Sequence, residues 1–245
     1  MASQIDVFST ARAFSEDELK GKTVAVIDVL RAGSTIVSAL YNGARGVIPV
    51  TDMGEASKIA GNLDARNYIL CGEHNGFRID GYKLGNSPLE YTKENVDGKT
   101  VILNTTNGSG AIRRSHLGTR VLIATFLNLA KVIDELKKTD NEIILICAGT
   151  KNRLAIEDML CAGAIIHGLW EGRLHGKEAD GAKVAFSLYE KFGDHFENVI
   201  RNSNHGEWLI EQFGDDDVDY CSNQNSLPVL PVLKEGVIRL ADGNW

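Results

Sequence analysis

Four carboxylates occur within or directly after apolar stretches of the sequence: Asp28, Glu73, Glu157 and Asp158. An ionised carboxylate in apolar surroundings costs free energy unless a cation neutralises it. Carboxylate oxygens are hard ligands, which suit Mg²⁺ better than zinc. We therefore predict that some of these four side chains hold a magnesium ion. Asp28, Glu157 and Asp158, together with Arg31, are also the predicted catalytic residues.

These residues also have a purely structural interpretation. Asp28 could form an internal ion pair with Arg31, and Glu157 and Asp158 could complement the dipole of a buried helix that begins near them. The arginine is equally suited to anion binding, because a planar guanidinium can hold a phosphate or sulfonate with two parallel hydrogen bonds. The residue types alone leave both roles open.

Several polar loop residues could bind an anion beside these groups. The loop TTNGSG (105–110) has glycines and backbone N–H groups that can face an anion, although a tight turn would use the same residues. His74 is either an anion contact or a solvated loop histidine. No other histidine has metal-like spacing, so the others are interpreted as ordinary side chains. The predicted substrate-binding residues are Arg31, Ser34, His74, Thr106, Asn107, Gly108, Gly149 and Arg153.

The segment CAGTKNR (147–153) offers a competing chemistry. Its C-x5-R spacing is that of phosphatases in which a cysteine thiolate attacks phosphorus while an arginine holds the phosphate oxygens. Cys147 and Arg153 would then be the catalytic pair, and the carboxylates would have no role. A third alternative is a non-catalytic protein that binds an anionic metabolite, although simple anion binding needs cations and not four carboxylates.

Short apolar runs alternate with helix-like stretches along the chain, which predicts a three-layer α/β/α fold with a largely parallel or mixed sheet. Strands are predicted at 24–30, 46–50, 68–71, 101–104, 120–124 and 143–149, and helices at 34–44, 54–63, 126–138 and 154–170. Polar clusters follow four of the strands, at 28–35, 71–81, 104–112 and 147–158. The sheet should bring them to one edge, where α/β proteins bind ligands.

The chain is predicted to form one α/β unit over residues 1–245. GKTVAVIDVLRAGS (21–34) and GKTVILNTTNGSG (98–110) resemble each other. This suggests either a duplication, with two similar intertwined lobes that divide near residue 115, or two unrelated strand-helix units. In the C-terminal third, the acidic run 215–219 is interpreted as a solvated loop and the segment 226–240 as an extended return.

Composition excludes several classes of protein. The 245 residues carry a net charge of −7, which argues against nucleic acids and anionic membranes as partners. No run of about 18 apolar residues exists, and the N-terminus lacks the apolar region of a secretory signal. The four cysteines show no metal-like spacing, so we expect reduced thiols and a cytoplasmic location. A homodimer is expected only because it is the commonest assembly.

Several long segments carry a family resemblance. VIDVLRAGSTI, LGNSPLEY, TTNGSGAI and CAGTKNRLAIEDMLCAGAII stand in order, and the similarity extends from about residue 22 to 232. The sequence resembles the 2-phosphosulfolactate phosphatase family. The stretch after DVLRA, which is Thr-rich in the family, reads GST here.

The resemblance implies a Mg²⁺-dependent phosphatase. It implies hydrolysis of (R)-2-phospho-3-sulfolactate, a small and multiply anionic phosphate ester, to 3-sulfolactate and phosphate, as in coenzyme M biosynthesis. The nucleophile would be water or Asp28. The DxDx[TV] spacing of familiar aspartyl phosphatases is absent.

Overall fold

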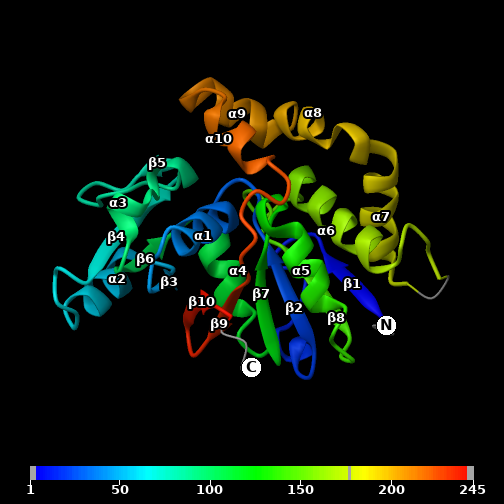
Figure 1. Cartoon of the computed structure of the whole chain (residues 1–245), viewed down its shortest axis with the longest axis horizontal. Helices are drawn as coiled ribbons and strands as arrows, with labels where there is room; N and C mark the ends of the chain where they lie inside the picture. Colours follow the sequence, from blue (N-terminus) through cyan, green and yellow to red (C-terminus); the bar gives the residue numbers. More distant parts are fainter. Residues whose placement is uncertain (1–3, 176–177, 242–245) are drawn as a thin grey trace.

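The computed structural model describes residues 4–175 and 178–241, and within these ranges helices surround a ten-stranded sheet (Figure 1). The strands are β1 (Ile5–Phe8), β2 (Thr23–Ile27), β3 (Gly46–Val50), β4 (Tyr68–His74), β5 (Phe77–Arg78), β6 (Thr100–Asn104), β7 (Arg120–Ala124), β8 (Ile143–Cys147), β9 (Pro231–Lys234) and β10 (Val237–Leu240). The α-helices are α1 (Ala32–Tyr41), α2 (Met53–Ala60), α3 (Lys93–Val96), α4 (Gly108–Arg114), α5 (Leu129–Leu136), α6 (Ile156–Leu169), α7 (Asp180–Phe192), α8 (Phe196–Arg201), α9 (Asn204–Phe213) and α10 (Asp216–Cys221). Short 3-10 helices lie at Glu16–Leu19, Pro88–Glu90, Phe126–Asn128 and Gly193–His195.

The sheet has the strand order β1-β8-β2-β7-β9-β10-β3-β6-β4-β5. The first four strands in this order are parallel, and so are β3, β6 and β4. The antiparallel hairpin β9–β10 joins the two groups by pairing with β7 and β3. The predicted α/β class and mostly parallel sheet are confirmed. Strands from both sides of residue 115 pair in this sheet, while a duplication stays a prediction.

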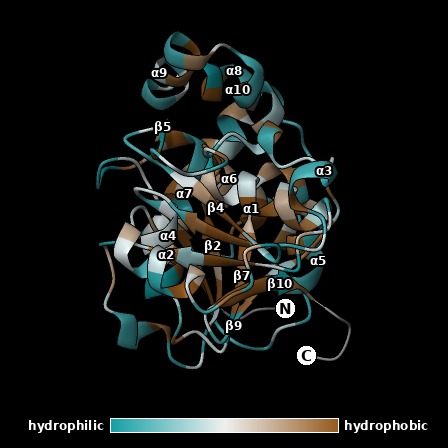
Figure 2. Cartoon of the chain, turned by 90° about the vertical axis from the view of Figure 1, so that its left-hand side faces the viewer, coloured by the Kyte–Doolittle hydropathy of each residue, from teal (hydrophilic) through white to brown (hydrophobic). Residues whose placement is uncertain are grey.

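The side chains of β2 alternate between two hydrophobic cores. Ala25 and Ile27 belong to a core that also contains residues of α5, α6 and α7, whereas Val24 and Val26 belong to one shared with α1 and α4. A strand that is covered on both faces must be apolar throughout, which is why a continuous apolar run indicates this kind of strand. Figure 2 shows hydrophobic strands at the centre and hydrophilic residues on the outer helices.

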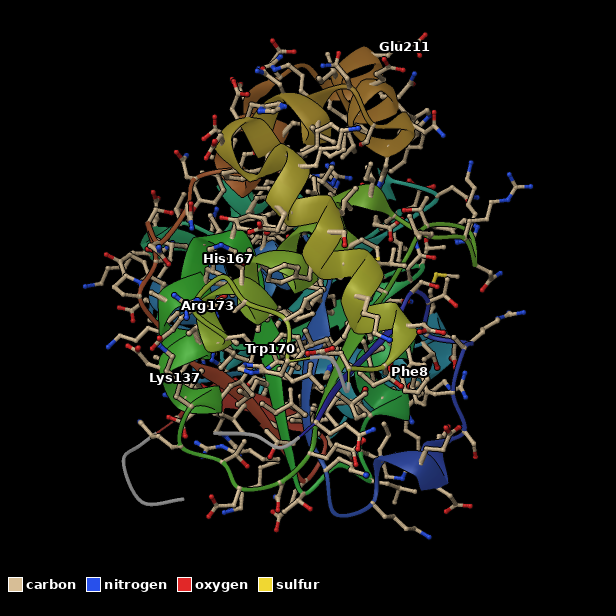
Figure 3. All side chains as sticks on the ribbon, turned by 90° about the vertical axis from the view of Figure 1, so that its right-hand side faces the viewer. Phe8, Lys137, His167, Trp170, Arg173 and Glu211 are labelled. Carbon is tan, nitrogen blue, oxygen red and sulfur yellow. The ribbon has the colours of Figure 1, made fainter. Side chains whose placement is uncertain are left out.

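We call residues 196–221, which form α8–α10, the cap. Figure 1 shows the cap beyond the ends of the strands, above α1 and α6. Figure 3 shows α7 rising toward the cap and Glu211 at its outer tip. Phe196 stacks on Phe126 with ring centroids 4.3 Å apart, and Leu209 is fully buried. These contacts attach the cap to the main hydrophobic core.

The C-terminal third departs from one expectation and agrees with another. The acidic run 215–219 is not a solvated loop, because most of it lies in α10 and Asp217 is buried. The extended character expected for 226–240 is confirmed by β9 and β10. The edge strand β1 has no counterpart among the predicted strands. Within the described ranges, the helices are too short or too polar to cross a bilayer.

Candidate active site

A cavity of about 990 Å³ opens at the carboxyl ends of the parallel strands. Its wall is formed by the segments that follow β2, β4, β6 and β8, and by the first part of α9 in the cap. The predicted convergence of four polar clusters at one edge is therefore confirmed. The contribution of the cap was not predicted. A concave site of this size is large enough for a small metabolite.

Asp28 directly follows β2 and lines the cavity. Its Oδ1 accepts a hydrogen bond from the backbone N–H of Ala32 at 3.1 Å, at the start of α1. Its Oδ2 lies against the backbone of Gly108, where a β-carbon would overlap both this oxygen and the Cβ of Ala32. Only glycine allows this approach of the β6–α4 loop, so the Asp28 carboxylate is held at the cavity wall by two loops.

Glu73 lines the cavity, but its oxygens are occupied by backbone. Oε1 accepts the N–H of Thr106 at 2.7 Å. Oε2 accepts the N–H of Gly76 at 2.6 Å and the Thr106 hydroxyl at 2.9 Å. Glu73 thus ties the turn after β4 to the loop after β6. This geometry gives it a loop-holding role, while the predicted metal-binding role stays a prediction.

Both oxygens of Asp158 are also held by backbone N–H groups, and its predicted catalytic and metal-binding roles stay predictions. Its Oδ1 accepts the N–H of Val29 at 2.9 Å and its Oδ2 accepts the N–H of Gly149 at 3.0 Å. The side chain is buried behind the residues that line the cavity. Asp158 therefore joins the loops after β2 and β8, and neither of its oxygens faces the cavity as a free ligand.

The pKa of Asp28 is raised from 3.8 to about 7, chiefly by burial; the charges of Glu73 and Glu157 contribute to this rise, while His205 and the N–H of Ala32 oppose it. Burial likewise raises the pKa of Asp158 well above its usual value, with the Asp28 charge as the second cause. The cluster thus holds more negative charge than its surroundings stabilise. A cation in the cavity would relieve this repulsion.

Glu157 lies in the first turn of α6 and faces the cap. Its Oε1 is 3.1 Å from Nδ1 of His205, which is also 3.1 Å from the Thr150 hydroxyl. Ser203 begins α9 by accepting the N–H of Gly206 at 2.9 Å, and this places His205 in the first turn. His205 therefore contacts a carboxylate of the cavity wall, which its interpretation as an ordinary side chain did not anticipate.

Arg31 lines the cavity and is buried, but its ion-pair partner is not Asp28. Nη1 donates to Oδ2 of Asp217 at 2.6 Å, and Nη2 donates to the carbonyl of Gly76 at 3.0 Å. The guanidinium also lies over the ring of Phe213, 5.1 Å from its centroid. Arg31 thus links the loop after β2, the turn after β4 and the cap.

The remaining predicted binding residues divide into two groups. Thr106, Asn107, Gly108 and Arg153 line the cavity. Three others do not line it: Ser34, His74 and Gly149. The Ser34 hydroxyl is fully buried and donates to the carbonyl of Val29 at 2.8 Å, His74 is exposed at the end of β4, and Gly149 holds Asp158 through its N–H.

The donor set fits a magnesium ion only in part. Among the described residues, no group of three or more His, Cys, Asp or Glu side chains could hold a metal ion alone. Asp28 and Glu157 each keep one carboxylate oxygen without a hydrogen bond from a described residue. Mg²⁺ is commonly held by one or two carboxylates, with waters and a substrate phosphate as its other ligands. These two residues fit that pattern.

Residues 8–236 match the model of a family described as 2-phosphosulpholactate phosphatase. The chain belongs to this family. Membership places it among phosphoric monoester hydrolases, and the matched range contains every residue of the cavity wall discussed above.

Relatives of known name agree with the family match. A protein of Thermotoga petrophila is 41% identical over 90% of this chain and 93% of its own length, and one of Thermotoga maritima is 40% identical over the same shares. A protein of Caldanaerobacter subterraneus subsp. tengcongensis is 34% identical over 96% of this chain and 97% of its own length. Each of the three is named "Probable 2-phosphosulfolactate phosphatase".

The structure contradicts the cysteine mechanism. Cys147 is fully buried in a hydrophobic core, and its Sγ contacts Sδ of Met159 at 3.7 Å. Burial raises the pKa of the Cys147 thiol well above its usual range, and the charge of Asp158 adds to the effect. A thiol that stays protonated and does not reach the cavity cannot attack phosphorus. Arg153 lines the cavity without this partner.

We expect the Cys147→Ala variant to keep phosphatase activity within about threefold of the wild type, because the thiol does not touch the cavity. Its melting temperature should fall by a few degrees, since a buried sulfur is lost. Phosphate release and thermal unfolding of both proteins measure this. A loss of more than a hundredfold in turnover without unfolding would restore the cysteine mechanism.

Sequence reasoning assigned no role to several polar residues of the wall, among them Asn86, Thr150 and His205. It also missed Asp217, which does not line the cavity but pairs with Arg31. Asn86 stands in the segment LGNSPLEY, which contributes to the family resemblance but suggests no chemistry of its own. His205 and Asp217 lie in the cap. The described residues of the cap contain no apolar strand, and the site was predicted from the polar residues that follow such strands. Of these residues, only Asp217 has a sequence feature that could have indicated its role. It directly precedes an apolar position of a short helix, which is unusual for an acidic residue on a solvated loop.

Proposed function

We propose that this chain hydrolyses 2-phospho-3-sulfolactate to 3-sulfolactate and phosphate with the help of Mg²⁺. The proposal is carried by the convergence of Asp28, Glu157 and Arg31 on one cavity in a chain that belongs to the phosphatase family named above. Carboxylates beside a guanidinium are what a metal-assisted reaction of a multiply anionic ester requires.

The negative charge of the cavity wall supports the proposal of a bound metal ion. Glu73, Glu157, Asp158 and Asp28 lie at or just behind the wall, whereas the buried Arg31 is already paired with Asp217. A substrate with phosphate, sulfonate and carboxylate groups would add further negative charge. We infer that Asp28 and Glu157 hold a Mg²⁺ ion, which when bound would neutralise phosphate charge and act as a Lewis acid.

The chain's own residues position the ester. Arg31, Asn107 and Gly108 line the cavity, and in this proposal the guanidinium and the two backbone N–H groups hold the anionic oxygens of the ester. The first part of α9 adds the cap to the wall. The reaction consumes one water molecule: its oxygen forms a bond to phosphorus and the bond between phosphorus and the C2 oxygen breaks. One proton of that water ends on the C2 oxygen, which becomes the hydroxyl of 3-sulfolactate, and phosphate is released.

The test is phosphate release from racemic 2-phosphosulfolactate, with Mg²⁺ and with excess EDTA. We expect release that EDTA abolishes and added Mg²⁺ restores. Release that EDTA does not affect would contradict the role of the metal. Binding of the ester, seen as thermal stabilisation, without any release would support the alternative of a non-catalytic anion-binding protein. A homodimer, a cytoplasmic location and a role in coenzyme M synthesis stay predictions.

A further inference from the structure

Asn86 is a buried polar side chain that the fold leaves without a partner. It lies in the loop that follows β5, lines the cavity and is only 6% exposed. Among the described residues, none bonds its Oδ1, and none bonds its Nδ2. Leaving a buried polar atom unpaired costs about 1–3 kcal/mol. This oxygen is an acceptor, which an anionic ligand cannot satisfy, so the group of Asn86 that such a ligand in the cavity can contact is the NH₂ of the same carboxamide.

The backbone of this residue is held firmly. The Thr35 hydroxyl, in the first turns of α1, donates to the Asn86 carbonyl at 2.8 Å. The hydroxyl of the next residue, Ser87, donates to Oδ1 of Asp217 at 2.5 Å. The unpaired carboxamide therefore does not reflect a mobile loop, and its position at the cavity wall is fixed on both sides.

Arg31 belongs to the same part of the wall. Its partner Asp217 is the residue that Ser87 also contacts, so the guanidinium and the loop of Asn86 share one anchor. A guanidinium has five N–H groups, and in the described part of the chain the hydrogen bonds to Asp217 and Gly76 occupy two of them. The others remain for a ligand. Arg31 and Asn86 together offer N–H donors that are already oriented.

This part of the wall differs from the one formed by Asp28 and Glu157. The nearby carboxylates Glu73 and Asp217 have both oxygens in hydrogen bonds with protein groups. An anionic group therefore meets paired carboxylates and free N–H donors here, whereas Asp28 and Glu157 present unpaired oxygens that repel an anion unless a cation intervenes. The described hydrogen bonds therefore make the Arg31–Asn86 part of the wall the more favourable one for an anionic group.

We propose that Asn86 and Arg31 form a subsite for the anionic group of the substrate that is not transferred, its sulfonate or its carboxylate. The Asn86 carboxamide turns its NH₂ toward an oxygen of that group while Arg31 supplies the charge. This subsite rests on the proposed function, because it presumes an ester with a second anion. It makes Asn86 a specificity-determining residue of the reaction.

The experiment compares three phosphate esters: 2-phosphosulfolactate, 2-phospholactate, which lacks the sulfonate, and 1-sulfo-2-propyl phosphate, which lacks the carboxylate. For Asn86→Ala we expect KM for 2-phosphosulfolactate to rise about tenfold or more, with kcat within threefold. The increase should vanish for the ester that lacks the recognised group, which identifies that group. Asn86→Asp should raise KM further because its charge repels the anion.

Two controls separate binding from structure. Asn86→Ala removes no hydrogen bond of the free protein, so its melting temperature should stay within about 2 °C of the wild type. Asn204→Asp places the same new charge on the exposed cap side of the cavity, and it should change KM alike for all three esters. A lower melting temperature with equal effects on all three esters, or an unchanged KM, would overturn the subsite.

The subsite can also be judged if the proposed function fails. If wild-type protein releases phosphate from none of the three esters, the probe becomes 3-sulfolactate, which keeps both the sulfonate and the carboxylate. Thermal stabilisation of the wild type that is lost in Asn86→Ala would support the subsite while the activity is rejected. Equal stabilisation of both proteins, or none of either, would reject the subsite as well.

Discussion

Replacing Asp28 with Asn is expected to lower phosphate release by about a thousandfold or more and, at the same time, to make the protein more stable to heat. The carboxylate is buried beside Gly108 and near Glu73 and Glu157. An amide keeps the shape and still accepts the N–H of Ala32, but it neither repels the neighbouring acids nor binds a cation well. Loss of function with gain of stability distinguishes a functional carboxylate from a structural one.

The stability effect depends on pH in a defined direction. Because the pKa of Asp28 in the folded protein is raised to about 7, the folded state holds this proton more tightly than the unfolded chain does. The contribution of this proton to the free energy of unfolding is complete below a pH of about 4, the pKa of Asp in the unfolded chain. It is lost as the pH rises through about 7, the pKa in the folded protein. The loss amounts to at most about 4 kcal/mol.

Thermal unfolding of metal-free protein between pH 5 and 8.5 measures this. The melting temperature of the wild type should fall across this range more steeply than that of Asp28→Asn, and Mg²⁺ at pH 8 should raise it for the wild type only. Asp134→Asn, a change at an exposed residue of α5, serves as the matched control and should alter neither activity nor the pH profile. An active Asp28→Asn variant would reject the proposed role.

The second large effect is expected at the buried ion pair of Arg31 and Asp217, whose side chains are only 5% and 7% exposed. Arg31→Met leaves the Asp217 carboxylate buried without its cation, which should destabilise the fold by about 3–5 kcal/mol. In a chain of this size that corresponds to a fall of about 10 °C in melting temperature. Asp217→Leu should destabilise the fold by a similar amount, because it leaves the buried Arg31 guanidinium without its carboxylate.

The double variant Arg31→Met/Asp217→Leu should recover most of the lost stability, because no unpaired charge remains. Its activity should stay low, since Arg31 is missing from the cavity. Asp17→Asn, which breaks the exposed pair with Lys20, is the control and should leave the melting temperature unchanged. If both single variants unfold at the wild-type temperature, the pair does not attach the cap to the cavity wall.

Much of the fold could be predicted because a short, continuous apolar run is compatible with few kinds of secondary structure. A run such as VAVI has no polar side to expose, so it becomes a strand covered on both faces, and β2 pairs with β7 and β8 as this requires. The polar residues after each strand then converge without further information. The helices of the cap lack such a signal, because they are amphipathic and border an acidic stretch that resembles a solvated loop.

The roles of individual acids could not be predicted with the same success. Residue type marks Glu73 and Asp158 as expensive to bury, and both are indeed buried. Residue type does not tell whether a metal ion or a backbone N–H binds their oxygens. A loop that folds back onto a carboxylate produces no recognisable spacing of residues in the sequence. The partner of Arg31 was missed for a related reason, since Asp217 lies 186 positions further along the chain.

The β9–β10 hairpin has a consequence for how the protein is made. In the sheet of the described residues, the two parallel groups of strands are joined by this hairpin, which is formed by residues 231–240 and follows the other described strands along the chain. On the ribosome, β3 and β7 are therefore synthesised long before the strands that cover them, and each presents an open edge to other nascent chains. Premature termination before residue 231 would release a polypeptide with both edges unpaired, which favours aggregation over folding.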